Sequence, residues 1–174
     1  MKKMLKNKKG FSLIELLIVI AIMGVLAVIA FSMFSGVVSN SRKKADSTQA
    51  GNIQKALVAY MVDTGDAYLE NLRYTDPSTE ITDTNADEGE AIKTDDTWAE
   101  VVIALQRKQK VGDDVFEPFL NPKNGATPSS RDFKVQWTGH YGYKIEVFPE
   151  RMNATVEPAK TAEDNKIILP ERPE

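Results

Sequence analysis

The sequence contains no cysteine among its 174 residues. Disulfide bonds and thiolate metal sites are therefore excluded. The absence does not indicate a cellular compartment, because exported proteins can also lack cysteine. The length predicts one globular domain with accessory segments. If the chain is exported, core packing alone must stabilise that domain.

Residues that carry catalysis are also scarce. The single histidine, His140, lies in a stretch that reads as a turn and has no serine or cysteine nucleophile motif nearby. We find no phosphate-binding loop, paired zinc-ligand motif or glycine-rich dinucleotide fingerprint. With 22 basic and 25 acidic residues, the chain shows no general footprint for nucleic acid. The sequence therefore predicts a protein that is not an enzyme and needs no cofactor.

Charge is unevenly distributed along the chain. Residues 1–10 hold five lysines and no acidic residue, whereas residues 63–96 hold eleven acidic residues against Arg73 and Lys93. The middle of the folded part is therefore predicted to be acidic and polar.

Charge is almost absent from Phe11 to Phe34, where Glu15 is the only ionisable side chain among 24 residues. As a helix this segment would be about 36 Å long, enough for a hydrocarbon core of about 30 Å. It lacks the polar stripe of a helix in a soluble core, so we expect it to span a membrane. The N-terminal lysines favour a cytoplasmic N-terminus. Residues 42–44, all basic, weaken that preference without reversing it.

Three interpretations of this segment are open: a plain membrane anchor, a secretory signal that is removed, or a helix cleaved at its N-terminal end. The position of Glu15 helps to choose among them. Residues 28–30 resemble a secretory cleavage site, but a signal core has about 7–15 apolar residues and Glu15 would lie inside it. A plain anchor has no use for a charge that costs about 2.5–3.5 kcal/mol at mid-bilayer. Cutting after Gly10 would free the α-amino group of Phe11, a cation four residues before Glu15 on the same helical face.

This cation and the carboxylate could also pair between two staggered helices. Each Glu15 would then neutralise a neighbour's N-terminus in apolar surroundings, where charges are least screened. Repeated contacts of this head-to-tail kind build a filament. Removing one partner would leave a buried charge, at a cost of about 3–5 kcal/mol.

The stretch from Gly10 to Glu15, GFSLIE, follows a short lysine-rich leader and precedes the apolar run. It closely resembles the class III signal of type IV pilins and the related pseudopilins. The resemblance implies that a membrane prepilin peptidase cuts after Gly10 and N-methylates Phe11. It also implies that Glu15 assists docking into the growing pilus, and that an assembly platform with an ATPase drives this process.

The chain departs from the family in two places. Many pilins have a helix-breaking proline where this chain has Ser32, between Gly24 and Gly36. Because glycine weakens a helix by about 1 kcal/mol relative to alanine, this stretch could melt locally; alternatively, its small residues ease helix packing. The cysteine pair of many pilins is also missing, as it is in pilins of some Gram-positive bacteria.

We expect four segments along the chain. These are a cleaved leader (1–10), a transmembrane and assembly helix (11–35), an amphipathic continuation of that helix (36–64) and a globular head (65–174). The continuation carries an apolar stripe that we expect to pack on the head's own sheet. The stripe consists of Ala45, Ile53, Ala56, Leu57, Tyr60 and Met61, with Arg42, Asp46, Asn52 and Lys55 elsewhere.

The head begins with a long polar connection over residues 65–95. Within it, Asp83, Asn85 and Asp87 alternate as oxygen ligands do in a calcium loop. The glycine falls one place late, and Thr94 stands where a bidentate glutamate is needed. A solvated acidic loop is therefore favoured over a calcium site.

The rest of the head is expected to combine one helix with a sheet. Thr97 and Glu100 have the spacing of a capping box that opens a helix ending near Gln109. Strands are expected at 132–137, 141–148, 152–156 and 166–169. The predicted fold class is α+β: a long N-terminal helix packed on an antiparallel sheet of three or four strands, the pilin fold.

The leading functional hypothesis is a structural subunit of a type IV pilus, for adhesion, twitching motility or aggregation. Such a chain would cross the cytoplasmic membrane once before assembly and then lie in a surface filament. A pseudopilin of a type II secretion or DNA-uptake machine shares the signal and is the nearest alternative. A monomeric membrane-anchored binding domain is a further alternative. The size of the head and its poor calcium loop favour the pilin.

Overall fold

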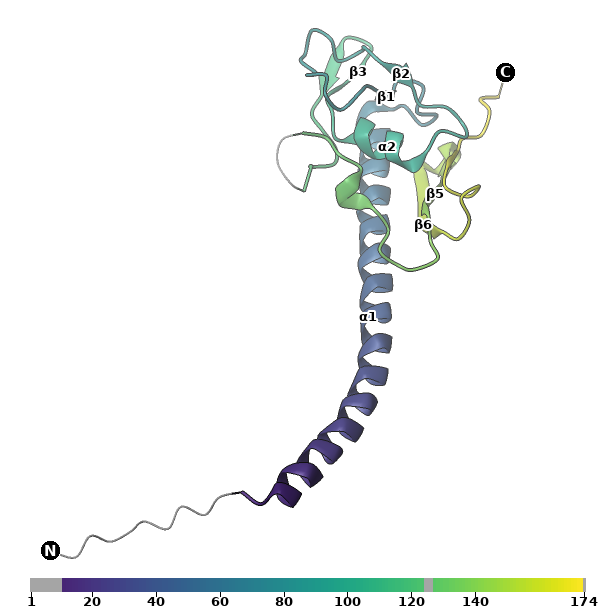
Figure 1. Ribbon diagram of the computed structural model, residues 1–174. Helices are drawn as coiled ribbons and strands as arrows, with labels where there is room; N and C mark the ends of the chain where they lie inside the picture. Colours follow the sequence, from purple (N-terminus) through teal and green to yellow (C-terminus); the bar gives the residue numbers. More distant parts are fainter. Residues whose placement is uncertain (1–10, 124–126, 174) are drawn as a thin grey trace, which may run out of the picture. The chain divides into compact units, whose positions relative to one another are not determined.

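The computed structural model describes residues 11–123 and 127–173 of the chain (Figure 1). It separates into two compact units, residues 1–41 and residues 42–174, and we describe each by itself. Helix α1 (Leu13–Thr64) contributes residues to both. The layout is the α+β arrangement expected, with a long N-terminal apolar helix and several small sheets.

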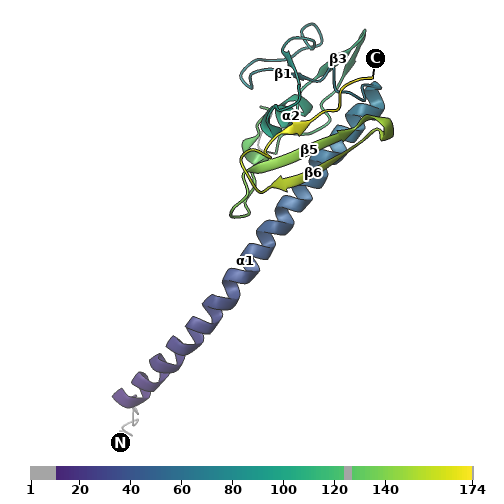
Figure 2. The same ribbon diagram turned by 90° about the vertical axis from the view of Figure 1, so that its right-hand side faces the viewer.

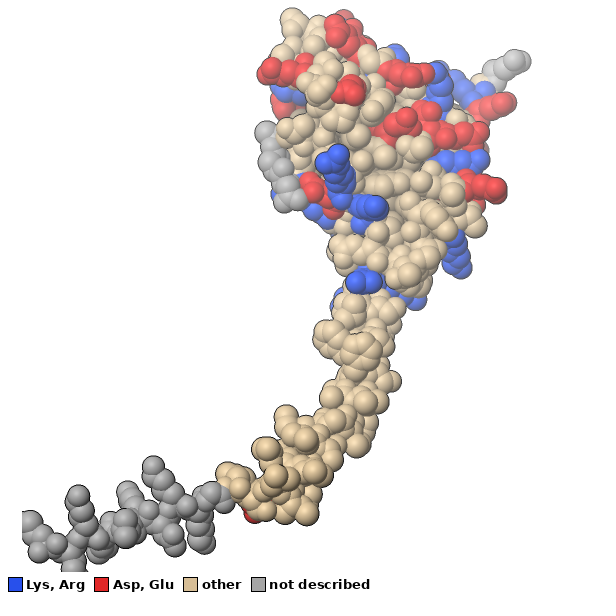
Figure 3. All heavy atoms as spheres, in the orientation of Figure 1, with Lys and Arg blue, Asp and Glu red and all other residues tan. Residues whose placement is uncertain are grey.

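The first unit is the apolar part of α1. Its large apolar side chains are exposed along the whole segment, as at Val28 and Phe31, where 72% and 76% of the side-chain surface is accessible. The helix is long and apolar enough to cross a membrane, and its most apolar window is not buried by the rest of the chain. Figure 3 shows the surface of this segment as almost uniformly uncharged. The observation fits the expected transmembrane helix.

The second unit, residues 42–174, begins with the remaining turns of α1, and from here on the word head means this whole unit. One face of this segment is buried at the spacing of three and four residues that a helix produces. The buried residues are Asp46, Gln49, Ala50, Ile53, Ala56, Leu57, Tyr60 and Met61. The expected stripe is confirmed from Ile53 onward. Near its start the prediction was wrong, because Ala45 is exposed and Asp46 is buried.

The main sheet of the head has strand order β6-β5-β7 (Figure 2). Strands β5 (Gly142–Phe148) and β6 (Asn153–Ala159) are antiparallel and joined through the 3-10 turn η2 (Pro149–Arg151). The short β7 (Ile167–Ile168) pairs parallel to β5, so the sheet is mixed where an antiparallel one was expected. Inward side chains of β5 and β6 join those of α1 and α2 in one hydrophobic core.

The strand expected over residues 132–137 is not formed, and that prediction was wrong. The segment forms a 3-10 turn, η1 (Arg131–Phe133), followed by a loop. Phe133 is buried as a core residue, but the backbone N–H groups of Gln136 and Trp137 donate to the carboxylate of Asp46. Because a side chain takes these donors, they are not available to a neighbouring strand.

Helix α2 (Trp98–Leu105) begins with the expected capping box, in which the backbone N–H of Thr97 donates to Glu100 Oε2 at 2.7 Å. The helix ends four residues before the expected Gln109. Trp98 packs edge-on against Tyr143 of β5, with ring centroids 5.3 Å apart. A Cβ atom on Gly142 would lie 2.2 Å from Trp98 Nε1, so glycine is needed for this approach.

Two small hairpin-like pairs were not foreseen. Strand β3 (Gln109–Val111) pairs antiparallel with β4 (Asp114–Phe116), and the intervening Gly112 has a φ of +64°. Glycine adopts such a positive φ at little cost, and a Gly-Asp pair is a known signal of a two-residue turn. Strand β1 (Arg73–Tyr74) pairs antiparallel with β2 (Glu90–Ala91), and together they enclose residues 75–89, which we call the acidic connection.

Candidate functional site

The N-terminal motif is described from Phe11 onward, so Gly10 lies outside the described residues. Phe11 is 87% exposed and precedes the first helical residue, Leu13. The backbone N–H of Ser12 donates to Glu15 Oε2 at 2.9 Å, and the N–H of Glu15 donates to the Ser12 carbonyl at 3.0 Å. Ser12 and Glu15 have the spacing of a capping box, and the Glu15 side chain makes one of its two hydrogen bonds. We missed this pattern in the sequence, although its S-x-x-E spacing is visible there.

This geometry places the Glu15 carboxylate at the start of α1. The first turn of a helix leaves N–H groups unpaired and carries partial positive charge, which a carboxylate stabilises. The N–H that Glu15 accepts belongs to the residue directly after Phe11. If the chain is cut after Gly10, the new α-amino group therefore lies within one residue of a group that Glu15 already binds.

The three small residues expected to loosen α1 all lie within its continuous helical turns. A Cβ atom on Gly24 or Gly36 would meet no atom of this chain within 4 Å. Ser35 Oγ donates to the carbonyl of Ser32 at 3.1 Å, a back-bond that satisfies the hydroxyl inside the helix. Neither glycine is thus required by packing within one chain.

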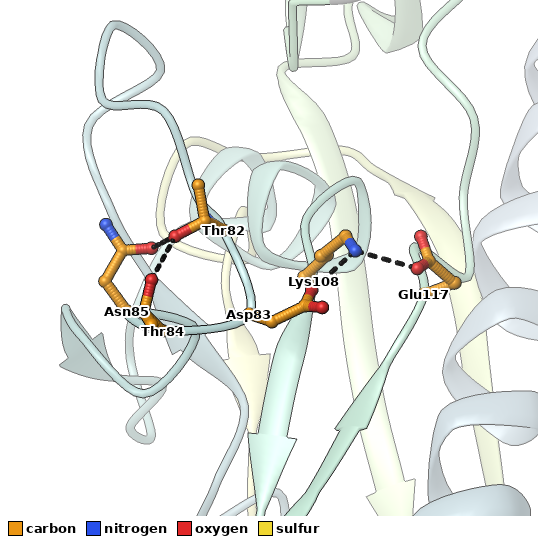
Figure 4. Close-up of polar contacts among 6 residues, drawn as sticks. All are labelled: Thr82, Asp83, Thr84, Asn85, Lys108 and Glu117. Carbon is orange, nitrogen blue, oxygen red and sulfur yellow. Dashed lines mark hydrogen bonds and ion pairs between the residues drawn. The ribbon is translucent and has the colours of Figure 1, made fainter.

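The candidate calcium ligands do not share a site (Figure 4). Asp83 pairs with Lys108 at 2.6 Å, and Asn85 Oδ1 accepts the N–H of Thr82 at 2.6 Å. Asp87 pairs separately with Lys110 at 3.2 Å. Across residues 11–123 and 127–173 no three acidic, histidine or cysteine side chains are grouped to hold a metal ion.

These contacts instead fasten the acidic connection to the elements beside it. Lys108 also pairs with Glu117 at 2.8 Å, and hydrogen bonds to Asp83 and Glu117 raise the pKa of the lysine. The hydrogen bond from Lys110 lowers the pKa of Asp87. The buried Arg107 donates from Nη1 to the Thr79 carbonyl at 2.7 Å and from Nη2 to the Asp76 carbonyl at 2.6 Å.

A second polar site lies at the first turns of α1 in the head. Asp46 is only 1% exposed and accepts the N–H groups of Gln136 at 3.0 Å and Trp137 at 2.8 Å. The Trp137 ring stacks on His140 at 3.8 Å, and Lys43 Nζ lies 5.1 Å from the Trp137 ring centre. Asp46 therefore fixes the loop that places Trp137 against Lys43.

The residue pattern at the N-terminus also matches a known motif. A profile described as the prokaryotic N-terminal methylation motif matches residues 5–31. The chain carries a type IV pilin signal. The matched residues include the exposed apolar start of α1 and Glu15, which stands four residues after Phe11.

A similarity to a fimbrial protein extends beyond this signal. The fimbrial protein EcpC of Eikenella corrodens is 44% identical to this chain over 63 residues. The alignment covers 36% of this chain and 41% of the relative, so the chain matches about two fifths of that protein's length. Because 63 aligned residues outnumber those of the motif, the likeness is not confined to the signal. No solved structure matches the chain significantly.

Proposed function

We propose that the chain is a structural subunit of a type IV pilus. In this proposal the prepilin peptidase cuts between Gly10 and Phe11 and methylates Phe11, and the mature chains stack through their N-terminal helices. The observation that carries the proposal is a type IV pilin signal that continues into an apolar helix uncovered by its own chain.

The uncovered helix needs other molecules around it. Burying one large aliphatic side chain is worth about 1.5–3 kcal/mol, and α1 exposes many of them before the head begins. Lipid covers these side chains while the chain waits in the membrane. Copies of the same helix cover them in a filament, where close packing and polar contacts replace lipid.

Glu15 gives this packing a register. In the single chain its carboxylate is satisfied by the N–H of Ser12 and by the helix start. In a filament the same carboxylate neutralises the α-amino group on Phe11 of a staggered neighbour. A misplaced copy leaves both charges unpaired in apolar surroundings, which is costly.

The proposal implies the rest of the assembly route. The subunit crosses the cytoplasmic membrane once, is extracted by an assembly platform with its ATPase and ends in a surface filament. Adhesion, twitching motility and aggregation are the activities expected of such a filament.

Imaging of cells tests the proposal against a pseudopilin, which would share the signal. Cells that make the wild-type chain should carry long surface filaments labelled by an antibody to the head, and cells lacking the chain should not. Gly10→Val should leave an uncut precursor in the membrane and no filaments, because it replaces the glycine after which the proposed cut is made. The similarity to a fimbrial protein supports the pilus. Processed chain without filaments at any expression level would favour the pseudopilin.

A further inference from the structure

The head begins with three basic side chains. Arg42, Lys43 and Lys44 are consecutive and exposed at the start of the head's segment of α1. On the face that Figure 3 shows, basic side chains lie around these first turns, whereas acidic and basic ones are mixed over the rest of the head. The nearest acidic residue along α1, Asp46, is buried and bound to backbone N–H groups.

One aromatic side chain, Trp137, lies beside the basic ones. Asp46 holds the loop that presents Trp137, and Lys43 Nζ contacts the face of its ring at 5.1 Å. Tyr141 follows in the same loop and is 62% exposed. We call Arg42, Lys43, Lys44, Trp137 and Tyr141 the basic–aromatic cluster.

We propose that the basic–aromatic cluster binds anionic lipid head groups and seats the head on the membrane surface before assembly. Tryptophan and tyrosine favour membrane–water interfaces, since one part of each ring system is apolar and another is polar. Basic side chains next to a membrane segment are attracted to anionic lipids. Lys43 and Trp137 bring the two residue types into direct contact.

The distance along α1 suits this partner. Arg42 follows Phe34 by eight positions, or about 12 Å along a helix. If Phe34 lies at the edge of the hydrocarbon core, the head-group layer occupies about 5–8 Å of that distance. The rest is shorter than the Debye length of about 10 Å at moderate salt. The side chains of Arg42, Lys43 and Lys44 can bridge the remainder.

The position of the three basic residues directly after the membrane segment also needs an explanation. Basic residues after a membrane segment oppose the orientation that the N-terminal lysines favour, so three of them carry a cost that lipid binding offsets. An acidic loop of a second copy is a weaker partner. Its carboxylates Asp83 and Asp87 already pair with lysines of their own chain.

The inference rests on the proposed function, because it assumes a membrane-anchored subunit waiting for assembly. Its test uses the full chain at one copy per nanodisc, where no filament can form. The nanodiscs contain phosphatidylcholine alone or with phosphatidylglycerol, plus a lipid with a nitroxide on its head group. Quenching of tryptophan fluorescence by the nitroxide reports how close the head lies to the lipid head groups. The chain has two tryptophans, and Trp137→Phe gives the background from the buried Trp98.

Phosphatidylglycerol should increase the quenching of Trp137, and added salt should reverse the increase. The triple variant Arg42→Gln, Lys43→Gln, Lys44→Gln should lower the docking equilibrium roughly 100-fold, about fivefold for each side chain. The matched variant Lys55→Gln, Arg151→Gln, Lys160→Gln removes three exposed charges elsewhere on the head. It should quench as the wild type does.

Two results would overturn the inference. One is equal quenching in the two lipid compositions. The other is quenching that rises with the number of copies per nanodisc whatever the lipid, which would assign the cluster to contacts between copies. Docking by a chain that never forms filaments would instead contradict the proposed function and leave the lipid contact standing.

Discussion

Asp46 shows at the scale of one residue how burial can contradict a polar pattern. On the sequence it belongs to the solvent side of an amphipathic helix, yet it is 1% exposed. Its two backbone partners lie about ninety positions further along the chain. A periodic pattern contains no information about such partners, so this site could not be predicted.

Asp46→Ala should lower the free energy of unfolding by about 2–3 kcal/mol. The substitution removes hydrogen bonds to a charged group and leaves two backbone donors without their acceptor. Chemical denaturation of the full chain in detergent measures the change. Asp63→Ala removes an exposed carboxylate from the same helix and should change stability by less than about 0.5 kcal/mol. Equal effects of the two variants would contradict the role of Asp46.

Glu15 can be tested for charge and for capping separately. Glu15→Ala should leave cleavage largely intact and abolish filaments. Glu15→Gln keeps an oxygen that accepts the Ser12 N–H but loses the charge, so it should also fail to assemble. Ser12→Ala leaves that backbone donor in place and should assemble normally. Counts of filaments on cells decide, and normal filaments with Glu15→Gln would refute the charge argument.

At the scale of elements, the acidic connection is held by two kinds of interaction, ion pairs and buried hydrogen bonds to backbone carbonyls. Lys108→Gln removes exposed ion pairs, which contribute at most about 1 kcal/mol. Arg107→Gln leaves the carbonyls of Asp76 and Thr79 without their buried donor, and it should cost about 1–3 kcal/mol. Hydrogen exchange over residues 76–88 should rise in both variants. Global stability should fall clearly in Arg107→Gln alone, and the opposite order would contradict this account.

The turn that ends α1 predicts a loss of stability in alkali. Tyr60 Oη donates to Asp66 at 2.8 Å, and burial, reinforced by the Asp66 charge, raises the pKa of Tyr60. Burial, with a contribution from Asp46, also raises the pKa of Tyr143. A raised pKa in the folded state means that the unfolded state releases the proton first. The stabilisation is therefore complete below about pH 10 and is lost as the pH rises above it.

Denaturation at increasing pH measures this effect. Above about pH 10 the free energy of unfolding should fall by at most about 1.4 kcal/mol per pH unit for each of the two tyrosines. Tyr60→Phe should make the slope shallower, and an unchanged slope would contradict the contribution of Tyr60.

Some elements could be predicted because their signals are local. The apolar run of α1, the capping box of α2 and the alternation in β5 each lie within a few turns or residues. The 3-10 turn at Arg131–Phe133 and the parallel pairing of β7 depend on contacts distant in sequence. The turn between β3 and β4 did have a local signal, Gly112 followed by Asp113, which we overlooked.

The whole molecule combines two units suited to different surroundings. The described residues leave the apolar unit uncovered, whereas the head has its own hydrophobic core and a charged surface. The type IV pilin signal lies in the apolar unit, and under the proposed function lipid covers that helix first and other subunits cover it later. The central claim is therefore that the helix begins at a newly made terminus.

Mass spectrometry of the mature chain purified from cells tests this claim most directly. The account predicts a chain that begins at N-methylated Phe11 and lacks residues 1–10. A chain that begins at Phe31 would identify a conventionally secreted domain, and an intact Met1 would identify a simple membrane anchor. Either result would contradict the account.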